Sequence, residues 1–370
     1  MAEDRISLWY LIGSLQVGGA ERTLVDLANN LNHETFDVTI WTILDENPLA
    51  SDLDENVTLR VIGASGKHDL TAAFGFVAAV RRTKPDILQS WVFFDNTLGR
   101  LASAASPGTT QISGVRAVPE DPSRLRATID RLTMPLADHV VSNSEAGREL
   151  AIDRGASPDS VSVIENGRNL EVYASASAPD DLRDSLGISG DAALVGTVGR
   201  LIERKGHYDL LEAWPAVIEE NPDARLLLVG DGTERDGLES RARELEIRES
   251  VTFMGTREDV ATLLDAMDVF VFPSHFEGLP GALIEAMAAG LPIICTPVDG
   301  NEELIEDCES GVFVDPRSPG QIATEVTTLI DSSKYADRLG DSARDRAETR
   351  FSIEVMVENF LKLYDSFLST

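Results

Sequence analysis

The chain has 370 residues, 43% hydrophobic and 26% charged, a composition typical of soluble globular proteins and a length typical of two domains. Its 63 acidic residues outnumber 32 basic ones, for a formal net charge of −31. Because affinity for nucleic acid comes from basic side chains, this charge argues against a nucleic-acid partner. Only five basic residues are lysines, and this acidic, lysine-poor composition predicts a halophilic protein; an acidic mesophilic enzyme is the alternative.

The N-terminal residues Met1–Asp4 are acidic and predict no signal peptide, and no apolar run reaches the ~20 residues of a membrane-spanning helix. Two cysteines cannot form a disulfide framework, so we expect a cytoplasmic protein.

Residues 70–170 differ from the rest of the chain in charge, with eleven acidic and eleven basic residues. We interpret this neutral stretch as facing an anionic partner, a phosphorylated acceptor or a lipid surface; uneven sampling of surface residues is the alternative.

Short apolar runs alternate with segments of helical period, a pattern typical of βαβ units. In the first half, strands are predicted at Ile6–Ile12, Val38–Leu44, Val57–Ile62, Asp86–Val92, Gln111–Val115, His139–Ser142 and Val161–Ile164. Helices are predicted between them at Ala20–Leu31, Thr71–Arg82, Arg124–Leu136 and Glu145–Asp153. Residues Tyr173–Asp181 have no period and indicate a linker.

The alternation begins again after the linker. Strands are predicted at Ala192–Val198, Arg225–Val229, Val251–Met254, Val269–Phe272 and Pro292–Cys295, and helices at His207–Glu220, Arg235–Leu245, Val260–Ala266, Gly281–Ala289 and after Ser318. We therefore expect an α/β fold of two Rossmann-like doubly wound parallel-sheet domains, residues 1–174 and 182–350, facing across a cleft. Ligands of such sheets bind beyond the carboxyl ends of the strands.

The first candidate motif runs from Gly13 to Glu21, directly after the first predicted strand, and contains the pair Gly18-Gly19. Glycines let a ligand approach the backbone, and a helix N-terminus supplies unpaired N–H groups. The P-loop and the G-x-G-x-x-G dinucleotide motif are both absent. The pair predicts an anion or hydroxyl site; a glycine pair that only closes the turn is the alternative.

The second motif places Gly199-Arg200 and then Lys205 after the first strand of the second half. The planar fork of arginine and the point charge of lysine both suit a diphosphate. A solvated helix cap is the alternative. In the first half, Arg116 follows the strand Gln111–Val115 and is a candidate contact for the phosphate of an acceptor.

The third motif runs from Pro273 to Gly290, carries Glu277 in its loop, and is the most informative. Pro280 lies where a helix can begin, so the amides around Gly278–Gly281 would point out of its N-terminus toward an anion. Glu285 lies one turn into that helix, where it reaches a hydroxyl beside the anion. Two carboxylates flanking a phosphate site suit a sugar nucleotide.

Other features are less specific. The histidines show no spacing that suits a metal site. The helix Thr71–Arg82 carries Phe74, Phe76, Val77 and Val80 ahead of Arg81 and Arg82, an arrangement that suits a lipid surface. Packing of this helix in the core is the alternative interpretation.

At these motifs the chain resembles the retaining glycosyltransferases of the GT-B fold, family 4, the glycosyl transferases group 1 type. The resemblance covers nearly the whole chain, and its most specific part is the paired-glutamate block Glu277–Met287 with Gly300–Leu304 after it. Further matches are Ser142–Ser144, Val163–Gly167, Leu228–Gly232 and Phe253–Gly255. The chain departs from the family pattern at Glu165, where the family usually has proline. This departure affects only the expected shape of the local loop.

The resemblance implies that Arg200 and Lys205 hold the diphosphate of a nucleotide-sugar donor, with Glu277 as a further catalytic residue that binds the transferred sugar. The donor site it implies comprises Gly18, Gly19, Gly199, Arg200, Lys205, Gly255, Gly278, Leu279, Pro280, Gly281 and Glu285, the last on the ribose. Arg116 and Gly18 are the candidate acceptor contacts. Residues 1–174 would bind the acceptor and residues 182–350 the nucleotide sugar, and a C-terminal helix at about 353–370 would pack back on the first domain.

The implied reaction moves a sugar, with retention, to a glycan, polysaccharide or lipid-linked saccharide. Fixed positive charges would stabilise the leaving diphosphate, so no metal and no cofactor is expected. Glu277 is either a nucleophile or a group that orients the transferred sugar. We favour front-face substitution, in which Glu277 orients the sugar. The alternatives are a sugar-nucleotide epimerase, an inverting GT-B transferase and a regulatory protein that binds a nucleotide sugar; a peripheral contact at the inner membrane face is a further expectation.

Overall fold

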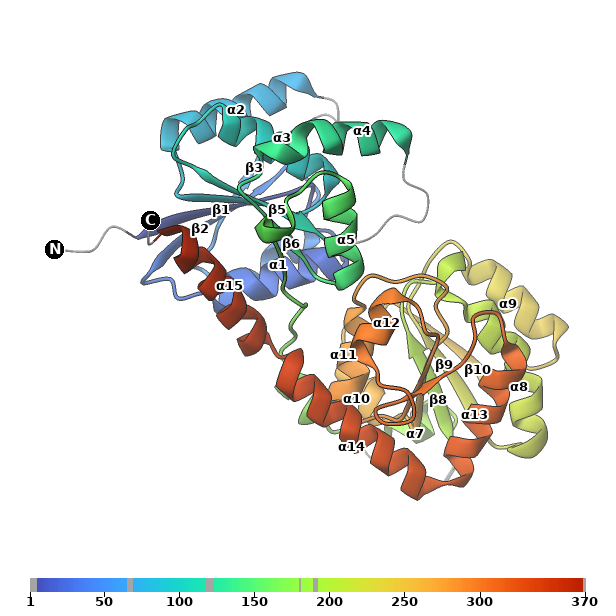
Figure 1. The fold of residues 1–370 in the computed structure, drawn as a ribbon. Coiled ribbons are helices and arrows are strands. Elements are labelled where there is room, and N and C mark those ends of the chain that lie inside the picture. The colour runs from blue at the N-terminus through green and yellow to red at the C-terminus, as the bar shows by residue number, and fades with distance from the viewer. Residues whose placement is uncertain (1–4, 65–68, 117–122, 180, 189–191, 369–370) are drawn as a thin grey trace. The chain divides into compact units, whose positions relative to one another are not determined.

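The computed structural model describes residues 5–64, 69–116, 123–179, 181–188 and 192–368 (Figure 1). The chain divides into two compact units. Unit 1 comprises residues 1–167 and 353–370, and unit 2 comprises residues 168–352. Each unit is built on one parallel sheet, in agreement with the fold expected from the alternating pattern.

The sheet of unit 1 has the strand order β3-β2-β1-β4-β5-β6-β7, and every neighbouring pair is parallel. The chain order reverses between β1 and β4, so a ligand site is expected beyond the carboxyl ends of these two strands. The strands are β1 Ile6–Ile12, β2 Phe36–Thr42, β3 Thr58–Val61, β4 Ile87–Ser90, β5 Thr110–Val115, β6 His139–Ser142 and β7 Val161–Val163.

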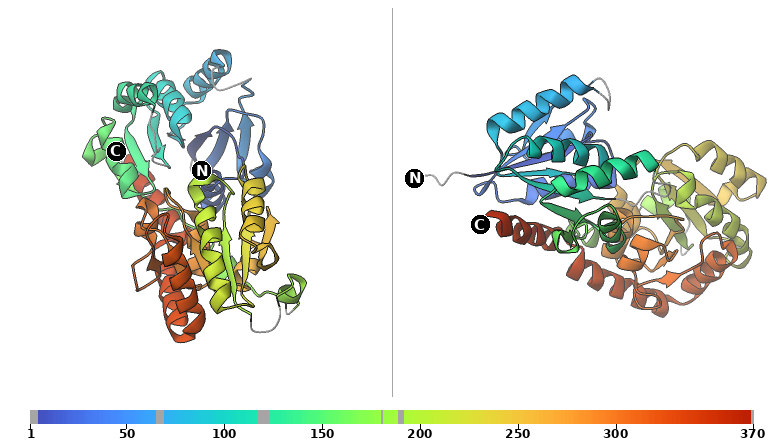
Figure 2. Two further views of the ribbon diagram at one scale, coloured as in Figure 1. Left: turned by 90° about the vertical axis from the view of Figure 1, so that its right-hand side faces the viewer. Right: turned by 45° about the horizontal axis from the view of Figure 1, so that its top comes forward.

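Helices cover both faces of this sheet, because alternate residues of β1 pack into two separate cores (Figure 2). Leu8 and Tyr10 belong to a core that includes residues of α1 and α15, whereas Trp9 and Leu11 pack with residues of α2 and α3. The helices are α1 Gly19–Asn30, α2 Leu70–Thr83, α3 Phe93–Ala104, α4 Arg124–Thr133, α5 Glu145–Asp153 and α15 Ile353–Leu368.

The sheet of unit 2 has the order β10-β9-β8-β11-β12-β13, again parallel throughout. Here the chain order reverses between β8 and β11. The strands are β8 Leu194–Val198, β9 Arg225–Val229, β10 Val251–Gly255, β11 Val269–Phe272, β12 Ile293–Cys295 and β13 Val312–Phe313.

Alternation along β9 divides the interior of unit 2 in the same way. Leu227 packs into one core with residues of α11, and Leu226 and Leu228 pack into another with residues of α8 and α13. The helices are α6 Glu171–Ala174, α7 Leu182–Ser185, α8 His207–Glu220, α9 Arg235–Glu244, α10 Val260–Asp265, α11 Gly281–Ala288, α12 Asp299–Leu304, α13 Pro319–Asp331 and α14 Ser333–Arg350.

The last helix, α15, is held by buried aromatic residues in the core of unit 1. The hydroxyl of Tyr364 donates to Oε1 of Gln89 at 2.6 Å and lies 2.9 Å from the hydroxyl of Tyr10. Phe360 is fully buried and its ring stacks on that of Trp91. The chain therefore supplies unit 1 from both of its ends.

Several expectations from the sequence differ from the structure, among them the following two. The helix α3 was not predicted, because Val92, Phe93 and Phe94 continue the apolar run of the strand before them. The predicted linker Tyr173–Asp181 overlaps the helix α6, and Tyr173 packs against the core of unit 2.

The helix α2 divides its apolar residues between the interior and the surface. Phe76 and Val80 are buried in the core of unit 1, whereas the side chain of Phe74 is 72% exposed. Among the described residues, no helix has the length and apolar character needed to cross a membrane.

Candidate functional site

Polar residues gather beyond β8 and β11, where the chain order of unit 2 reverses. Gly199 and Arg200 follow β8 directly, and the segment from Ser274 to Gly278 follows β11. Crevices at such reversals are the usual ligand sites of open α/β sheets. The second and third sequence motifs thus lie at neighbouring strand ends of one sheet.

A left-handed glycine brings these two loops together. Gly206 has φ +68°, and a Cβ at this position would lie 1.9 Å from the carbonyl oxygen of Pro273. Only glycine permits both this conformation and this approach. The backbone amide of His275 also donates to the carbonyl of Arg204 at 2.8 Å, which fixes the loop after β8 against the loop after β11.

The centre of the site is an ion pair between these loops. Nζ of Lys205 lies 2.5 Å from Oε1 of Glu277, and both side chains are largely buried, that of Glu277 to 6% exposure. Nζ also lies 4.8 Å from the ring centroid of Phe272. Burial lowers the pKa of Lys205, and the Glu277 carboxylate opposes this shift.

Two arginines accompany this pair. Nη1 of Arg204 donates to the carbonyl of Phe276 at 3.0 Å and lies 3.8 Å from Oε2 of Glu277. Arg200 is exposed and makes no ion pair with any other described residue. Positive charge from both residues contributes to the lowered pKa of Lys205, so the three cations share one region.

The helix α11 begins beside the same loop, after Pro280 as its N-cap. A Cβ at Gly281 would lie 2.4 Å from Nη2 of Arg168, so this guanidinium lies at the first turn of the helix. Nε of Arg168 is 3.5 Å from Oε1 of Glu285. The helix N-terminus and a buried guanidinium together give this end of α11 a positive potential.

Other glycines of the site permit close backbone contacts. A Cβ at Gly300 would overlap the carbonyl oxygen of Gly278, so the start of α12 lies directly against the loop before α11. The amide of Gly199 donates to Val229, and Gly255, with φ +68°, accepts from the amide of Gly230 at 2.9 Å. Leu279 is buried and anchors the loop between Glu277 and α11.

The structure thus brings together the unit 2 residues predicted from the motifs. Gly18, Gly19 and Arg116 lie in unit 1. Gly18 is the N-cap of α1 in extended conformation, and a Cβ at Gly19 would meet nothing within 4 Å. The backbone at Gly19 is therefore open to a ligand.

Arg116 is only 8% exposed, and its guanidinium stacks 3.9 Å from the ring of Trp91. Its Nη1 donates to Oδ1 of Asn166 at 3.4 Å, and its Nε and Nη2 find no acceptor among the described residues. Burial lowers the pKa of Arg116 to about 10, and it remains a cation at neutral pH.

Residues Arg168 and Arg204 were not singled out in the sequence. Arg204 directly precedes Lys205, and Arg168 directly follows Asn166-Gly167 of a matched motif, so adjacency to motif residues was the available signal. Within the described part of the chain, no group of three or more histidine, cysteine, aspartate or glutamate side chains is placed to hold a metal ion.

Comparison with known proteins agrees with this fold. HepE of Anabaena, solved in complex with UDP and glucose, has a TM-score of 0.84 and 24% sequence identity, over 98% of this chain and 100% of that one. The two parallel-sheet Rossmann-like units and this similarity define a GT-B fold.

The sequence patterns of two glycosyltransferase families cover most of the chain. "Glycosyltransferase Family 4" matches residues 17–172, and "Glycosyl transferases group 1" matches residues 179–346. The lipopolysaccharide core biosynthesis glycosyltransferase LpsE of Rhizobium meliloti is 30% identical over 293 residues, 77% of each chain. The protein belongs to the group 1 glycosyltransferase family and is a transferase enzyme.

A further relative covers more of the chain at lower identity. It is the Escherichia coli UDP-Gal:alpha-D-GlcNAc-diphosphoundecaprenol alpha-1,3-galactosyltransferase, 24% identical over 364 residues and 94% of each chain.

His207 is buried next to Gly206, and its shifted pKa makes the stability of the protein depend on pH. Burial, with a contribution from the charge of Lys205, lowers the pKa of His207 to about 3. We predict that the native imidazole stays neutral from about pH 8 to about pH 5, whereas in the unfolded chain it titrates near 6.5. As the pH falls from 6.5 toward 3, only the unfolded state gains this proton, so His207 lowers stability across that window.

The measurement is the NMR titration of the His207 imidazole, assigned with His207→Gln, in native protein and in urea. A native midpoint near 6.5 would contradict the prediction.

Proposed function

We propose that the enzyme transfers a sugar from a nucleotide-sugar donor to a saccharide acceptor with retention of the anomeric configuration and without a metal ion. The observation that carries this proposal is the contact of Lys205 and Arg204 with Glu277 at the strand ends, with Arg200 directly after β8 and α11 beginning beside the same loop. In this proposal unit 2 binds the donor and unit 1 binds the acceptor. The HepE structure, which contains UDP and glucose, supports this class of donor.

The proposed diphosphate site has the charges that the reaction needs. Breaking the bond between the anomeric carbon and the phosphate oxygen leaves an electron pair and negative charge on the leaving diphosphate. Arg200, Lys205 and the amides at the start of α11 stabilise that charge as it develops. Because these charges are fixed by the fold, they supply what a divalent cation supplies in other transferases.

Glu277 is placed to orient the transferred sugar. Its Oε1 is engaged by Lys205, and Oε2 faces Arg204 at 3.8 Å, so its charge is held in one position. In the proposed front-face step, the acceptor hydroxyl forms the new bond on the side from which the diphosphate leaves. The hydroxyl proton passes to the leaving phosphate oxygen, and Glu285 binds the ribose.

The acceptor in this proposal is a glycan, a polysaccharide or a lipid-linked saccharide. The name of the E. coli relative specifies a diphosphoundecaprenol-linked acceptor, which supports the lipid-linked class.

The proposal is tested on the wild-type enzyme with UDP-, GDP- and ADP-sugars in KCl-containing buffer. We expect one nucleotide sugar to bind, a product with the donor's anomeric configuration by NMR, and turnover that EDTA leaves unchanged. Inverted product or loss of turnover with EDTA would contradict the corresponding part of the proposal.

Arg200→Ala tests the diphosphate site. We predict a fall in kcat of about 100- to 1,000-fold, because one fixed donor to the developing charge is removed. Since Arg200 is exposed and forms no ion pair with described residues, the variant should keep the wild-type melting temperature. Arg243→Ala, an exposed arginine on α9, is the matched control and should retain wild-type kcat. Near-normal turnover of Arg200→Ala would remove Arg200 from the site.

Glu277→Gln tests the role of the buried carboxylate. If Glu277 orients the sugar, the variant should retain measurable transfer, since glutamine still accepts a hydrogen bond. The change leaves the Lys205 ammonium without its carboxylate partner, which can destabilise the fold. The variant is therefore checked for folding by circular dichroism. A glycosyl adduct on Glu277, trapped in the wild-type enzyme and found by mass spectrometry, would show that it is a nucleophile.

A further inference from the structure

Arg168 is the first residue of unit 2, and its backbone is bound to the segment by which the chain leaves that unit. Its amide donates to the carbonyl of Phe351 at 2.9 Å, and it forms a β-bridge with Ser352. Phe351 is fully buried in the core of unit 2, and Leu170 packs into the same core. The point from which the Arg168 side chain extends is therefore fixed within unit 2.

The side chain of Arg168 lies against the first turn of α11. A Cβ at Gly281 would lie 2.4 Å from Nη2, 3.0 Å from Nε and 3.1 Å from Cζ, so the guanidinium lies directly against this glycine. Nε is also 3.5 Å from Oε1 of Glu285, one turn further along the helix. The small size of Gly281 thus permits the contact between Arg168 and Glu285.

The two partners differ in their access to solvent. The Arg168 side chain is 5% exposed, whereas that of Glu285 is 17% exposed. The guanidinium is therefore enclosed by the protein, and part of the carboxylate can be reached by a ligand. A ligand-binding group supported from inside by a fixed partner has this arrangement.

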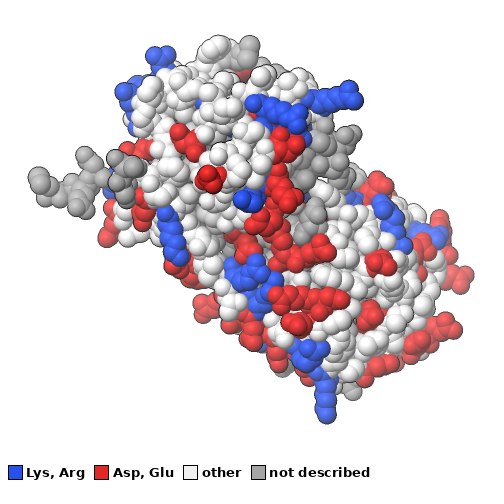
Figure 3. Space-filling model, viewed as in Figure 1, with Lys and Arg blue, Asp and Glu red and all other residues white. Residues whose placement is uncertain are grey.

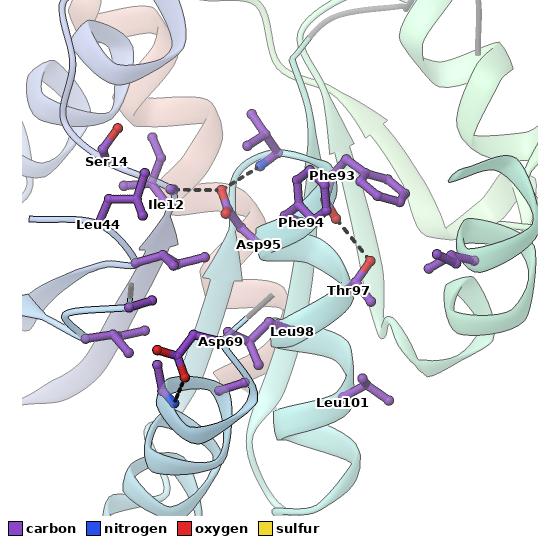
Figure 4. A pocket seen from close by; sticks show the side chains of 18 of the residues that line it. Ile12, Ser14, Leu44, Asp69, Phe93, Phe94, Asp95, Thr97, Leu98 and Leu101 are labelled. Atoms are coloured by element: carbon purple, nitrogen blue, oxygen red, sulfur yellow. Dashed lines mark hydrogen bonds between the residues drawn. The ribbon is translucent and has the colours of Figure 1, made fainter. Parts of the chain in front are cut away.

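The equivalent helix of unit 1 holds an acidic residue in another way. The helix α3 follows β4 at the reversal of strand order in unit 1, as α11 follows β11 in unit 2. Its first turn carries Asp95, in the wall of a cavity of about 460 Å³ (Figure 4). Oδ2 of Asp95 accepts from the amides of Gly13 at 3.1 Å and Val92 at 3.3 Å. Backbone amides can thus orient a carboxylate at this place in the fold, and the guanidinium beside Glu285 is a specific feature of unit 2.

A second effect of Arg168 is electrostatic. Glu285 lies beside the helix N-terminus to which the proposed function assigns the diphosphate, and a carboxylate there repels an anion. On the face drawn in Figure 3, acidic side chains are spread over much of unit 2, which adds to this repulsion. The buried guanidinium of Arg168 compensates the charge of Glu285 from the interior, where salt screens it little.

We propose that Arg168 is a positioning residue that fixes the Glu285 carboxylate toward the ribose of the donor, so that selection of ribose over deoxyribose depends on Arg168. This inference rests on the proposed function, in which Glu285 binds the ribose, and it names the residue that controls Glu285. A glutamate side chain has several rotatable bonds, and holding it in one rotamer before the ligand arrives removes an entropic cost from binding.

The test compares a nucleoside diphosphate with its 2′-deoxy and 3′-deoxy analogues by calorimetry. The nucleotide is whichever of UDP, GDP and ADP binds the wild-type enzyme most tightly. We expect the wild type to bind at least one deoxy analogue about 10- to 100-fold more weakly, as for the loss of a hydrogen bond to a charged group. The ratio of the two dissociation constants is the readout, because base and diphosphate contribute equally to both.

Arg168→Met removes the guanidinium and keeps a flexible side chain that suits a buried position. We expect the ratio to fall to within about threefold of one, because Glu285 is then free to change rotamer. Loss of the positive charge weakens the nucleotide and its analogues by a common factor, which the ratio cancels. A ratio that stays at the wild-type value, or rises, overturns the inference.

Gly281→Ala displaces the guanidinium without removing it, and it serves if Arg168→Met fails to fold. The new Cβ would overlap Nη2 of Arg168, the end of a flexible side chain, so the guanidinium has to move. Gly281 lies in α11, where alanine is the more favourable residue. We expect the ratio to fall as in Arg168→Met, and a wild-type ratio here also contradicts the inference.

Arg344→Gln is the matched control, because Arg344 holds the other end of the same helix. Its Nη2 donates to the carbonyl of Ala289 at 2.8 Å and its Nε to that of Ala288 at 3.3 Å. The variant should have a lower melting temperature and a wild-type ratio. If Arg344→Gln lowers the ratio as much as Arg168→Met does, Arg168 acts only through the stability of α11 and the inference is wrong.

The failure of this inference and that of the proposed function are distinguishable in the same measurements. Wild-type enzyme that binds none of UDP, GDP and ADP contradicts the proposed donor site. Wild-type enzyme that binds the nucleotide and both deoxy analogues equally contradicts the ribose role of Glu285, and the inference fails with it. Wild-type enzyme that discriminates, with an Arg168→Met variant that discriminates equally, contradicts the role of Arg168 alone.

Discussion

The candidate site in unit 2 depends on a buried ammonium and carboxylate held in contact. Lys205 and Glu277 come from loops that follow two neighbouring strands, and each would be an uncompensated buried charge without the other. Their approach in turn requires Gly206, because any side chain there would collide with Pro273. A single backbone conformation therefore determines where the cations of the site lie, and Arg200 and Arg204 extend the positive region around the same pair.

The distribution of charge is the second constraint on this molecule. A chain with a net charge of −31 repels phosphorylated ligands at long range, so binding them requires local concentrations of positive charge. Such a concentration occurs in unit 2 beyond β8, at Lys205 and Arg204. Lys205 is largely buried there against a carboxylate, and in unit 1 Arg116 is buried against the ring of Trp91. Burial excludes the salt and water that would otherwise screen these charges.

Much of this architecture could be predicted from local patterns, and the exceptions have physical reasons. β1, β9, β11, α5 and α8 begin and end at the predicted residues, since buried parallel strands and amphipathic helices have distinct periods. Besides the apolar run at its start, helix α3 was missed for a second reason, that its buried face carries polar residues: Asn96 donates to the carbonyl of Gly114, and Arg100 donates to Ser113. The motifs around Lys205 and Glu277 were recognisable separately. Their contact, and the position of Arg168 at the first turn of α11, follow from tertiary structure that spacing does not reveal.

The place of α15 in the core of unit 1 affects how the protein folds during synthesis. Unit 2 is encoded as one continuous segment, so its sheet and helices can be completed before translation ends. Unit 1 lacks Phe360 and Tyr364 until α15 leaves the ribosome, and until then the apolar face containing Tyr10 and Trp91 is without its cover. The nascent N-terminal half is thus the more vulnerable to aggregation and to chaperone capture, although it is made first.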